Sequence, residues 1–380
     1  MPRQLDALTG LRFLAAFHVV LFHLTAGYLT HLPAPIGNLL GQGPESVTLF
    51  FILSGFVLVY TYRDRAADDP RLFWWARVAR IYPVYLLTLL VALPMFLGHP
   101  PQYDNIQLDS PNLPLGGTFN THLVAGLACL LLLQAWLPPA VLKWNYPGWS
   151  RSAEAFFYAV FPWLSAILAR QSPRRLRQVA LATCLASIGM TAGWWVLSRQ
   201  LPPDRILNVW WGDVRQFNPL IRLPEFVIGM VIGFRFMDGT TPAQPDRRAV
   251  MATVAIIGIW MVRWTGVAAQ FENSLLIPIY ATLVLSLAYG QGRAGRWLAS
   301  PTMVSLGKAS YALYLVHAPI IFFSMKLFSL DRTPGPHYLR TGIELLTTAA
   351  VAVGASLLIY RFVEEPARQR IRRWSGSGQA

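Results

Sequence analysis

The sequence predicts an all-α, polytopic membrane protein with about ten transmembrane helices around a central cavity. Of the 380 residues, 54% are hydrophobic and only 13% are charged, whereas soluble domains average about 25% charged residues. The mean hydropathy is +0.41, and several apolar runs approach the roughly 20 residues that a helix needs to cross a bilayer. The alternating pattern of transmembrane β-strands is not visible. These observations predict helices that span a membrane.

Apolar stretches mark the expected helices in chain order. Eleven candidates can be read from the sequence: 11–30, 47–62, 81–97, 121–137, 152–169, 178–198, 220–237, 249–265, 274–290, 302–325 and 339–360.

Arginine placement then tests how many of these segments cross the membrane. Several arginines occur in each of five connecting segments: 63–80, 170–177, 235–248, 291–300 and 361–373. Arginine-rich connections lie on the cytoplasmic side of the cytoplasmic (inner or plasma) membrane. If 121–137 does not cross, all five connections lie on that side. We therefore expect ten spans, both termini in the cytoplasm, and 121–137 as a re-entrant or interfacial helix. The loop 199–219, with three arginines, falls outside and is the weakest point of this topology.

Charge, cysteines and domain organisation narrow the function further. The net charge of +14 comes mostly from arginines between apolar segments, which indicates membrane orientation and not nucleic-acid binding. Cys129 and Cys184 lie inside apolar segments, so we expect core packing, with no disulfide and no metal site. We expect one transmembrane domain over 1–374 and a flexible tail over 375–380.

Ionisable residues inside the first apolar segment are the first functional signal. Eleven residues make almost three helical turns, so Arg12 and His23 share one face about 16 Å apart along the axis. His18 points well away from His23, and a structural hydrogen bond explains it best. With the N-terminus inside, His23 is expected near mid-membrane, where an ionisable group usually faces a cavity or a partner. A snorkelling Arg12 and an interhelical hydrogen bond from His23 are the structural alternative.

A pair of arginines forms the second signal, in FWWARVARIYP at 73–83. Arg77 and Arg80 are three residues apart on a helix and therefore share a face. Two guanidiniums on one face suit a polyphosphate, because each can bind it through two hydrogen bonds. An ordinary juxtamembrane cluster of positive charge is the alternative.

Two further segments place polar groups within expected helices. In NYPGWSRSAEAFFYAVFP at 145–162, Glu154 could favour the helix dipole or orient an imidazole, with Trp149 and Ser150 just above it. In SLGKASYALYLVHAP at 305–319, the spacing of Ser310, Tyr314 and His317 forms a polar stripe, flanked by Tyr311. Such a stripe should face the bundle interior, although a hydrogen-bond ladder between helices is an equal reading.

Two shorter features are expected to be mainly structural. Ser54 and Gly55 in FFILSGFV at 50–57 are small enough to permit close helix contact. Arg222 and Glu225 in NPLIRLPEF at 218–226 are spaced to form an ion pair within one helix. Together with the motifs above, these features suggest a pore with an anion site at its inner mouth and proton-transfer groups in its middle.

These motifs, in this order and over nearly the whole chain, resemble the acyltransferase family 3 membrane proteins. The matching residues are Arg12 and His23; Phe51-Ile52-Leu53-Ser54-Gly55-Phe56; Arg77 and Arg80 before Ile81-Tyr82-Pro83; Trp149-Ser150 with Glu154 and Phe157-Tyr158; Ser310-Tyr311 through His317; and Arg361-Phe362 with Glu364-Glu365-Pro366. The family often has a tryptophan after the glutamate, where this chain has Ala155.

The resemblance implies about ten transmembrane helices and transfer of an acyl group, usually acetyl, from acyl-CoA to a hydroxyl of a carbohydrate or glycosylated small molecule. Many members carry a fused soluble hydrolase-like domain, for which the sequence leaves no room after residue 374. That weakens the case for acceptors that need such a domain.

Geometry and resemblance together assign expected roles to the candidate residues. We expect Arg12, Arg77, Arg80 and Ser54 to bind acyl-CoA, and His23, Glu154 and Tyr311 to carry the catalysis. Trp149, Ser150, His317 and Arg222 are expected to bind the acceptor. His23 serves as general base or as an acyl relay, Glu154 or another polar neighbour orients it, and Tyr311, Ser54 or His317 donates to the oxyanion. The rival hypothesis is a proton-coupled transporter or flippase for an anionic or lipid-linked solute.

Overall fold

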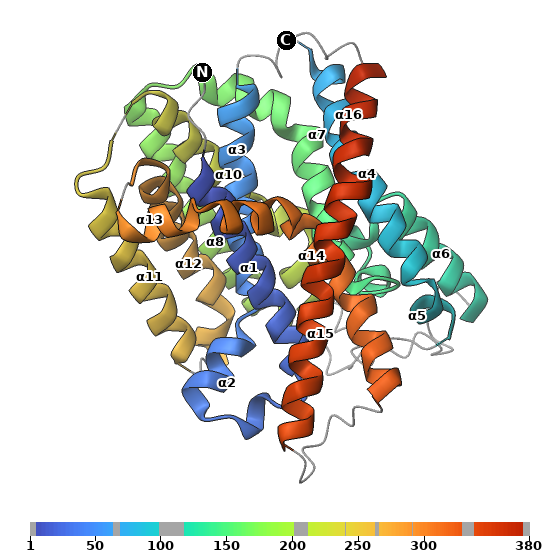
Figure 1. Ribbon diagram of the computed structural model, residues 1–380. Helices are drawn as coiled ribbons and strands as arrows, with labels where there is room; N and C mark the ends of the chain where they lie inside the picture. The colour runs from blue at the N-terminus through green and yellow to red at the C-terminus, as the bar shows by residue number, and fades with distance from the viewer. Residues whose placement is uncertain are drawn as a thin grey trace.

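The structure is a computed structural model that describes residues 5–63, 69–98, 118–200, 212–239, 241–262, 266–290, 292–328 and 338–374. Within these ranges the chain forms helices, turns and irregular connections, and it contains no strand. Figure 1 shows a bundle of long helices, in which the first described helix runs through the middle of the molecule and the last reaches its upper end in this view.

The longer helices follow the chain in order. They are α1 (Asp6–Thr25), α2 (Ala34–Gly41), α3 (Glu45–Tyr62), α4 (Pro70–Val91), α6 (Thr118–Leu130), α7 (Trp149–Ala169), α8 (Pro173–Ser198), α10 (Pro219–Met237), α11 (Pro245–Met261), α12 (Gly266–Tyr289), α14 (Pro301–Phe328), α15 (Tyr338–Ile359) and α16 (Glu365–Trp374). Shorter elements are α5 (Leu93–Gly98), α13 (Arg293–Leu298), four 3₁₀ turns (Leu29–His31, Gln134–Trp136, Pro138–Ala140 and Tyr146–Gly148) and the π-helical turn η5 (Tyr360–Glu364).

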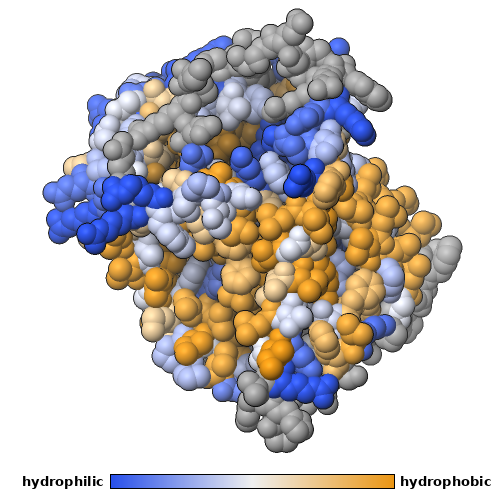
Figure 2. All heavy atoms as spheres, in the orientation of Figure 1, coloured by the Kyte–Doolittle hydropathy of each residue, from blue (hydrophilic) through white to orange (hydrophobic). Residues whose placement is uncertain are grey.

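Seven helices are long and apolar enough to cross a membrane within the described part of the chain, fewer than the ten expected. Three further helices fall short for identifiable reasons. α4 and α10 carry three or more charged residues each, and α11 has only 17 residues. Some of the charges in α4 and α10 belong to the candidate site described below. Figure 2 shows a broad apolar surface over the middle of this face of the molecule, with hydrophilic residues gathered toward its upper part.

Segment 121–137 does not form one continuous helix. α6 ends at Leu130, and 3₁₀ turns occupy Gln134–Trp136 and Pro138–Ala140. Thirteen helical residues extend only about 20 Å, less than the roughly 30 Å hydrocarbon core of a bilayer. This length agrees with the predicted re-entrant or interfacial element.

The most extensive helix contacts in the bundle join α3 to α10 and α1 to α14. Glycine permits the first: a Cβ on Gly55 would lie 2.2 Å from the Phe226 carbonyl oxygen, and one on Gly229 would lie 2.1 Å from that of Ile52. The close contact predicted at Ser54-Gly55 is therefore confirmed. A Cβ on Gly307 would similarly meet the backbone of α1 at Thr9. These contacts fix α1, the helix that carries Arg12 and His23, against α14, the helix that carries His317.

Candidate active site

His23 lies in the last turn of α1, nearer the far end of the helix than its middle. The helix begins at Asp6, five residues before the predicted segment 11–30, and it ends at Thr25. The expected position of His23 near mid-membrane stays a prediction. His18 points elsewhere: its two ring nitrogens lie 2.8 Å from the Ser46 hydroxyl and 2.8 Å from the Leu39 carbonyl oxygen. The structural reading of His18 is therefore confirmed.

A second histidine, fully buried on α14, contacts His23. His317 Nε2 lies 3.1 Å from His23 Nδ1, and His317 Nδ1 lies 3.3 Å from the Leu313 carbonyl oxygen. His23 Nδ1 is also 2.9 Å from the Val19 carbonyl oxygen. Because a carbonyl oxygen only accepts hydrogen bonds, we assign a proton to Nδ1 of each ring. His317 Nε2 then accepts from His23, and the basic lone pair of His23 resides on Nε2.

His23 borders a cavity of about 270 Å³, which we call the histidine pocket. His317 lies next to this cavity through its contact with His23. Its wall combines aromatic and polar side chains; among them are Tyr146, Trp149, Asp213, Gln216, Phe217 and Tyr314. The ring of Tyr146 lies 4.7 Å from that of His23, centroid to centroid. Aromatic faces with a few convergent polar groups are typical of small-molecule sites.

The three candidate arginines converge inside the bundle rather than facing lipid. Arg12 and Arg80 are close enough to interact electrostatically, and both interact with Glu154, Tyr158 and Glu364. Arg77 interacts with Arg80 and Tyr158 in the same way. We call this group, drawn from α1, α4, α7 and the π-helical turn η5, the arginine cluster.

Within this cluster the three guanidiniums differ in how fully they are engaged. Arg77 donates a hydrogen bond to the Tyr62 hydroxyl, and its guanidinium lies over the rings of Tyr62, Phe73 and Tyr158 at 4.6–5.7 Å. Arg12 and Arg80, both half-buried, make no hydrogen bond or close ion pair with any described residue. Arg77 is therefore held by aromatic rings, whereas Arg12 and Arg80 can bind an anion.

Glu364 supplies a buried carboxylate to the arginine cluster. Its side chain is 5% exposed, and its Oε2 atom has no hydrogen-bond partner in the described structure. It lies at the end of η5, and π-helical turns often occur at functional sites. The sequence motif at 361–366 includes Glu364, but the sequence alone assigned it no role.

Glu154 accepts hydrogen bonds from three side chains, and His23 is not among them. It accepts hydrogen bonds from Arg151, from the Tyr158 hydroxyl and, at 3.2 Å, from the Ser54 hydroxyl. The His23 ring lies within hydrogen-bond distance of His317 and not of Glu154, so a role for Glu154 in orienting His23 stays a prediction without a direct contact. The ion pair with Arg151 follows the same i, i+3 spacing that identified Arg222 and Glu225, and this signal could have revealed Arg151 from sequence.

Arg151 links the two regions. Its guanidinium lies 5.4 Å from the centroid of the Tyr311 ring and 5.1 Å from that of Tyr314. Tyr314 in turn lines the histidine pocket and lies 6.1 Å from the His317 ring. An apolar cavity of about 450 Å³ borders Arg77 and Tyr158 but shares no lining residue with the histidine pocket. Packed polar side chains, rather than one open cavity, connect the regions in the described structure.

The remaining candidates occupy structural positions around the site. The Tyr311 hydroxyl donates to the Ile81 carbonyl oxygen at 2.7 Å, and the Ser150 hydroxyl donates to that of Pro147 at 3.1 Å. Neither residue lines the histidine pocket. The polar stripe on α14 is buried as predicted. The structure places neither of these two hydroxyls against a substrate space.

Arg222 also makes the predicted contacts. It pairs with Glu225 at 3.2 Å, donates to the Thr48 hydroxyl at 3.0 Å, and lies 5.9 Å from the centroid of the Trp149 ring. The predicted structural ion pair is confirmed, and it supports one wall of the histidine pocket through Trp149. His, Cys, Asp and Glu form no metal-binding group among the residues that the structure describes.

Comparison with known proteins finds relatives that match nearly the whole of this chain. The chain is 30% identical to the acyltransferase MdmB of Streptomyces mycarofaciens, over 97% of this chain and 93% of that one. It is 26% identical to the O-acetyltransferase OatA of Staphylococcus aureus and 22% identical to the peptidoglycan O-acetyltransferase OatA of Listeria monocytogenes. The chain spans 58% and 56% of the length of these two.

No solved structure matches the chain significantly. The model of one protein family, described as an acyltransferase domain, matches residues 5–361, nearly the whole length. The resemblance predicted from Arg12, His23, Arg77 and Arg80 is thereby confirmed: the chain belongs to acyltransferase family 3, a family of membrane acyltransferases.

Proposed function

We propose that this membrane acyltransferase moves an acyl group of acetyl size from acyl-CoA to a hydroxyl of a carbohydrate or glycosylated small molecule. The observation that carries the proposal is that His23 lines the histidine pocket while its ring is paired with His317 behind it. This pair presents a general base to a cavity of a size and lining suited to an acceptor.

The arginine cluster is the proposed site of the CoA phosphates. Arg12 and Arg80 carry positive charge without a close protein partner in the described structure, and phosphate oxygens can accept from both guanidiniums. Arg77, whose guanidinium packs against aromatic rings, adds a third positive charge to the same cluster. Arg12 and His23 lie about 16 Å apart along α1, a distance that the pantetheine arm could cover between phosphate and thioester. Binding there requires rearrangement of the polar side chains between the regions.

Acyl transfer then proceeds by proton removal and addition to the thioester. His23 Nε2 takes the proton of the acceptor hydroxyl while the oxygen of that hydroxyl attacks the thioester carbonyl carbon. The tetrahedral intermediate collapses, the C–S bond breaks, and the imidazolium returns the proton to the CoA sulfur. His317 holds the His23 ring through the Nδ1–H hydrogen bond. An acyl-histidine that relays the group is the other route open to the same nitrogen.

The acceptor is proposed to lie against Trp149, Tyr146 and Phe217. Aromatic faces pack against the apolar faces of sugar rings, and Asp213 and Gln216 supply hydrogen-bonding groups at the same wall. The names of the OatA relatives give the same class of acceptor, since one of them is a peptidoglycan O-acetyltransferase.

Acceptor-dependent release of CoA tests this function. Membranes or purified protein are incubated with labelled acetyl-CoA and a panel of glycans and glycosylated small molecules, with and without each acceptor. We expect free CoA and a labelled acceptor to appear together. A transporter would leave the thioester intact and would instead depend on a proton gradient, so that result would replace the proposal.

A further inference from the structure

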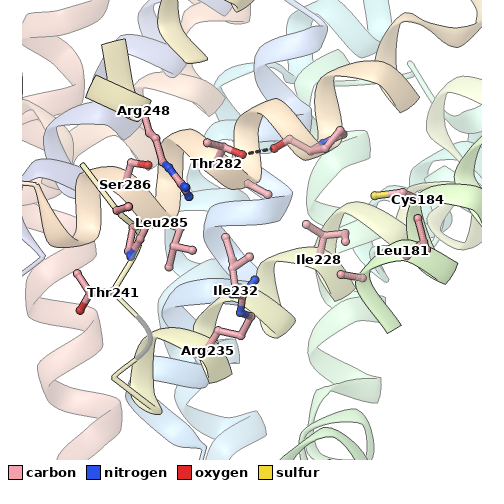
Figure 3. A pocket seen from close by; sticks show the side chains of 15 residues that line it. Leu181, Cys184, Ile228, Ile232, Arg235, Thr241, Arg248, Thr282, Leu285 and Ser286 are labelled. Carbon is pink, nitrogen blue, oxygen red and sulfur yellow. Dashed lines mark hydrogen bonds between the residues drawn. The ribbon is translucent and has the colours of Figure 1, made fainter. Parts of the chain in front are cut away.

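A second cavity, of about 450 Å³, lies between α8, α10, α11 and α12 and shares no lining residue with either region of the candidate site. Figure 3 shows Arg235 and Arg248 reaching into it from opposite sides, above and below Leu285 and Ile232. We call it the α8–α10–α12 groove. Its volume falls within the range of typical ligand sites.

The two ends of this groove differ in chemistry. In Figure 3, Arg235, Thr241 and Arg248 lie toward one end, and Leu181, Cys184 and Ile228 lie toward the other. Along α10 the wall extends seven residues from Arg235 to Ile228, about 10 Å. Most of that wall is made of Ala, Leu, Ile and Pro side chains. An apolar trough capped by two cations fits an amphiphile with an anionic head.

The two arginines carry charge that the described protein does not neutralise. Neither guanidinium makes a hydrogen bond or ion pair with any described residue, and no acidic residue lines the groove. The two nearby aspartates are engaged elsewhere: Asp238 pairs with Arg63 at 3.4 Å, and Asp246 accepts from the Gly292 amide at 2.7 Å. The charge therefore complements an anion from outside the protein.

The surroundings indicate that the groove borders lipid. Only 11% of the most apolar stretch of α8 is buried in the protein, and its Leu181, at the groove wall, is 63% exposed. On α11, Val250 and Val254 are exposed at 55% and 63%. We infer that the α8–α10–α12 groove binds an anionic glycerophospholipid, with the head-group phosphate between Arg235 and Arg248 and one acyl chain along α10 and α12.

Binding of defined lipids to the purified full-length chain in detergent tests this inference. Phosphatidylglycerol, phosphatidylcholine with the same acyl chains, and inorganic phosphate are titrated separately and followed by native mass spectrometry. We expect R235Q/R248Q to bind phosphatidylglycerol about thirtyfold more weakly, from the roughly tenfold or smaller contribution of each basic residue near an anionic lipid surface. Phosphatidylcholine should bind more weakly than phosphatidylglycerol to the unaltered chain.

The matched control is Arg247→Gln. Arg247 is the exposed neighbour of Arg248, does not line the groove, and donates to the Gln244 side chain at 3.2 Å. Equal weakening by R247Q, or no weakening by R235Q/R248Q, overturns the proposal. Displacement of the lipid by millimolar inorganic phosphate alone also overturns it, because the groove would then be a free-phosphate site.

A second measurement needs no substitution. Cys184 lines the groove, whereas Cys129 is 1% exposed and lies elsewhere. Phosphatidylglycerol should slow alkylation of Cys184 by a maleimide, with Cys129 as the internal control in the same mass spectrum. An unchanged rate for Cys184 at saturating lipid contradicts the placement of the acyl chain.

Discussion

The arginine cluster and the histidine pocket use the same helix, α1, in opposite ways. At the cluster, Arg12 meets residues from three other elements, and Arg12 and Arg80 make no close ion pair within the described structure. At the pocket, two histidines pair with each other beside an aromatic wall. Guanidiniums that make no close ion pair suit an anionic donor, whereas an imidazole beside aromatic rings suits an uncharged acceptor hydroxyl. Under the proposed function, this difference predicts one substrate for each region, with α1 extending between them.

The largest expected effect comes from removing the base. His23→Ala should lower acyl transfer about 10²- to 10⁴-fold, the range that general base catalysis contributes, while the protein remains inserted and folded. The measurement is acceptor-dependent CoA release, with thermal unfolding in detergent as the folding control. Normal turnover in this variant refutes the base assignment and removes the histidine half of the comparison.

The second largest effect is expected from breaking the buried ion pair of Arg151 and Glu154, which links the two regions. Glu154→Ala leaves Arg151 buried without its carboxylate, which should cost about 3–5 kcal/mol of stability. The double variant Arg151→Met with Glu154→Leu removes both charges and should recover much of that loss. Denaturation of the two variants and the unaltered chain in detergent measures this. A single variant as stable as the unaltered chain shows that the pair does not hold the link together.

A smaller effect is expected at His317, which we place as a positioning residue. His317→Phe removes the acceptor of the His23 Nδ1–H hydrogen bond, so kcat should fall about five- to tenfold, as the loss of one hydrogen bond implies. The KM for acyl-CoA should not change. His317→Gln keeps an oxygen acceptor and should restore part of kcat. If phenylalanine and glutamine behave alike, His317 serves packing alone.

Sequence reasoning succeeded where the relevant spacing lies within one helix. The shared face of Arg12 and His23, the Arg222–Glu225 pair and the buried stripe of Ser310, Tyr314 and His317 all follow from the 3.6-residue period. Length and composition identify seven spans rather than the ten expected, because charged side chains lower the hydropathy of α4 and α10 and α11 is one residue short of the required length. The contact of His23 with His317 and the electrostatic interaction of Arg12 with Glu364 join residues about 300 or more positions apart, and no local pattern encodes them.

The most direct test of whether the arginine cluster binds acyl-CoA and the histidine pocket binds the acceptor is the apparent KM for each substrate in two variants. Arg80→Ala removes a guanidinium from the arginine cluster, and Trp149→Ala removes an aromatic wall of the histidine pocket. We expect Arg80→Ala to raise the KM for acyl-CoA about tenfold or more, as the loss of a charged hydrogen bond implies, with the acceptor KM unchanged. Trp149→Ala should show the reverse. If Arg80→Ala changes only the acceptor KM, the assignment of one substrate to each end of α1 is wrong.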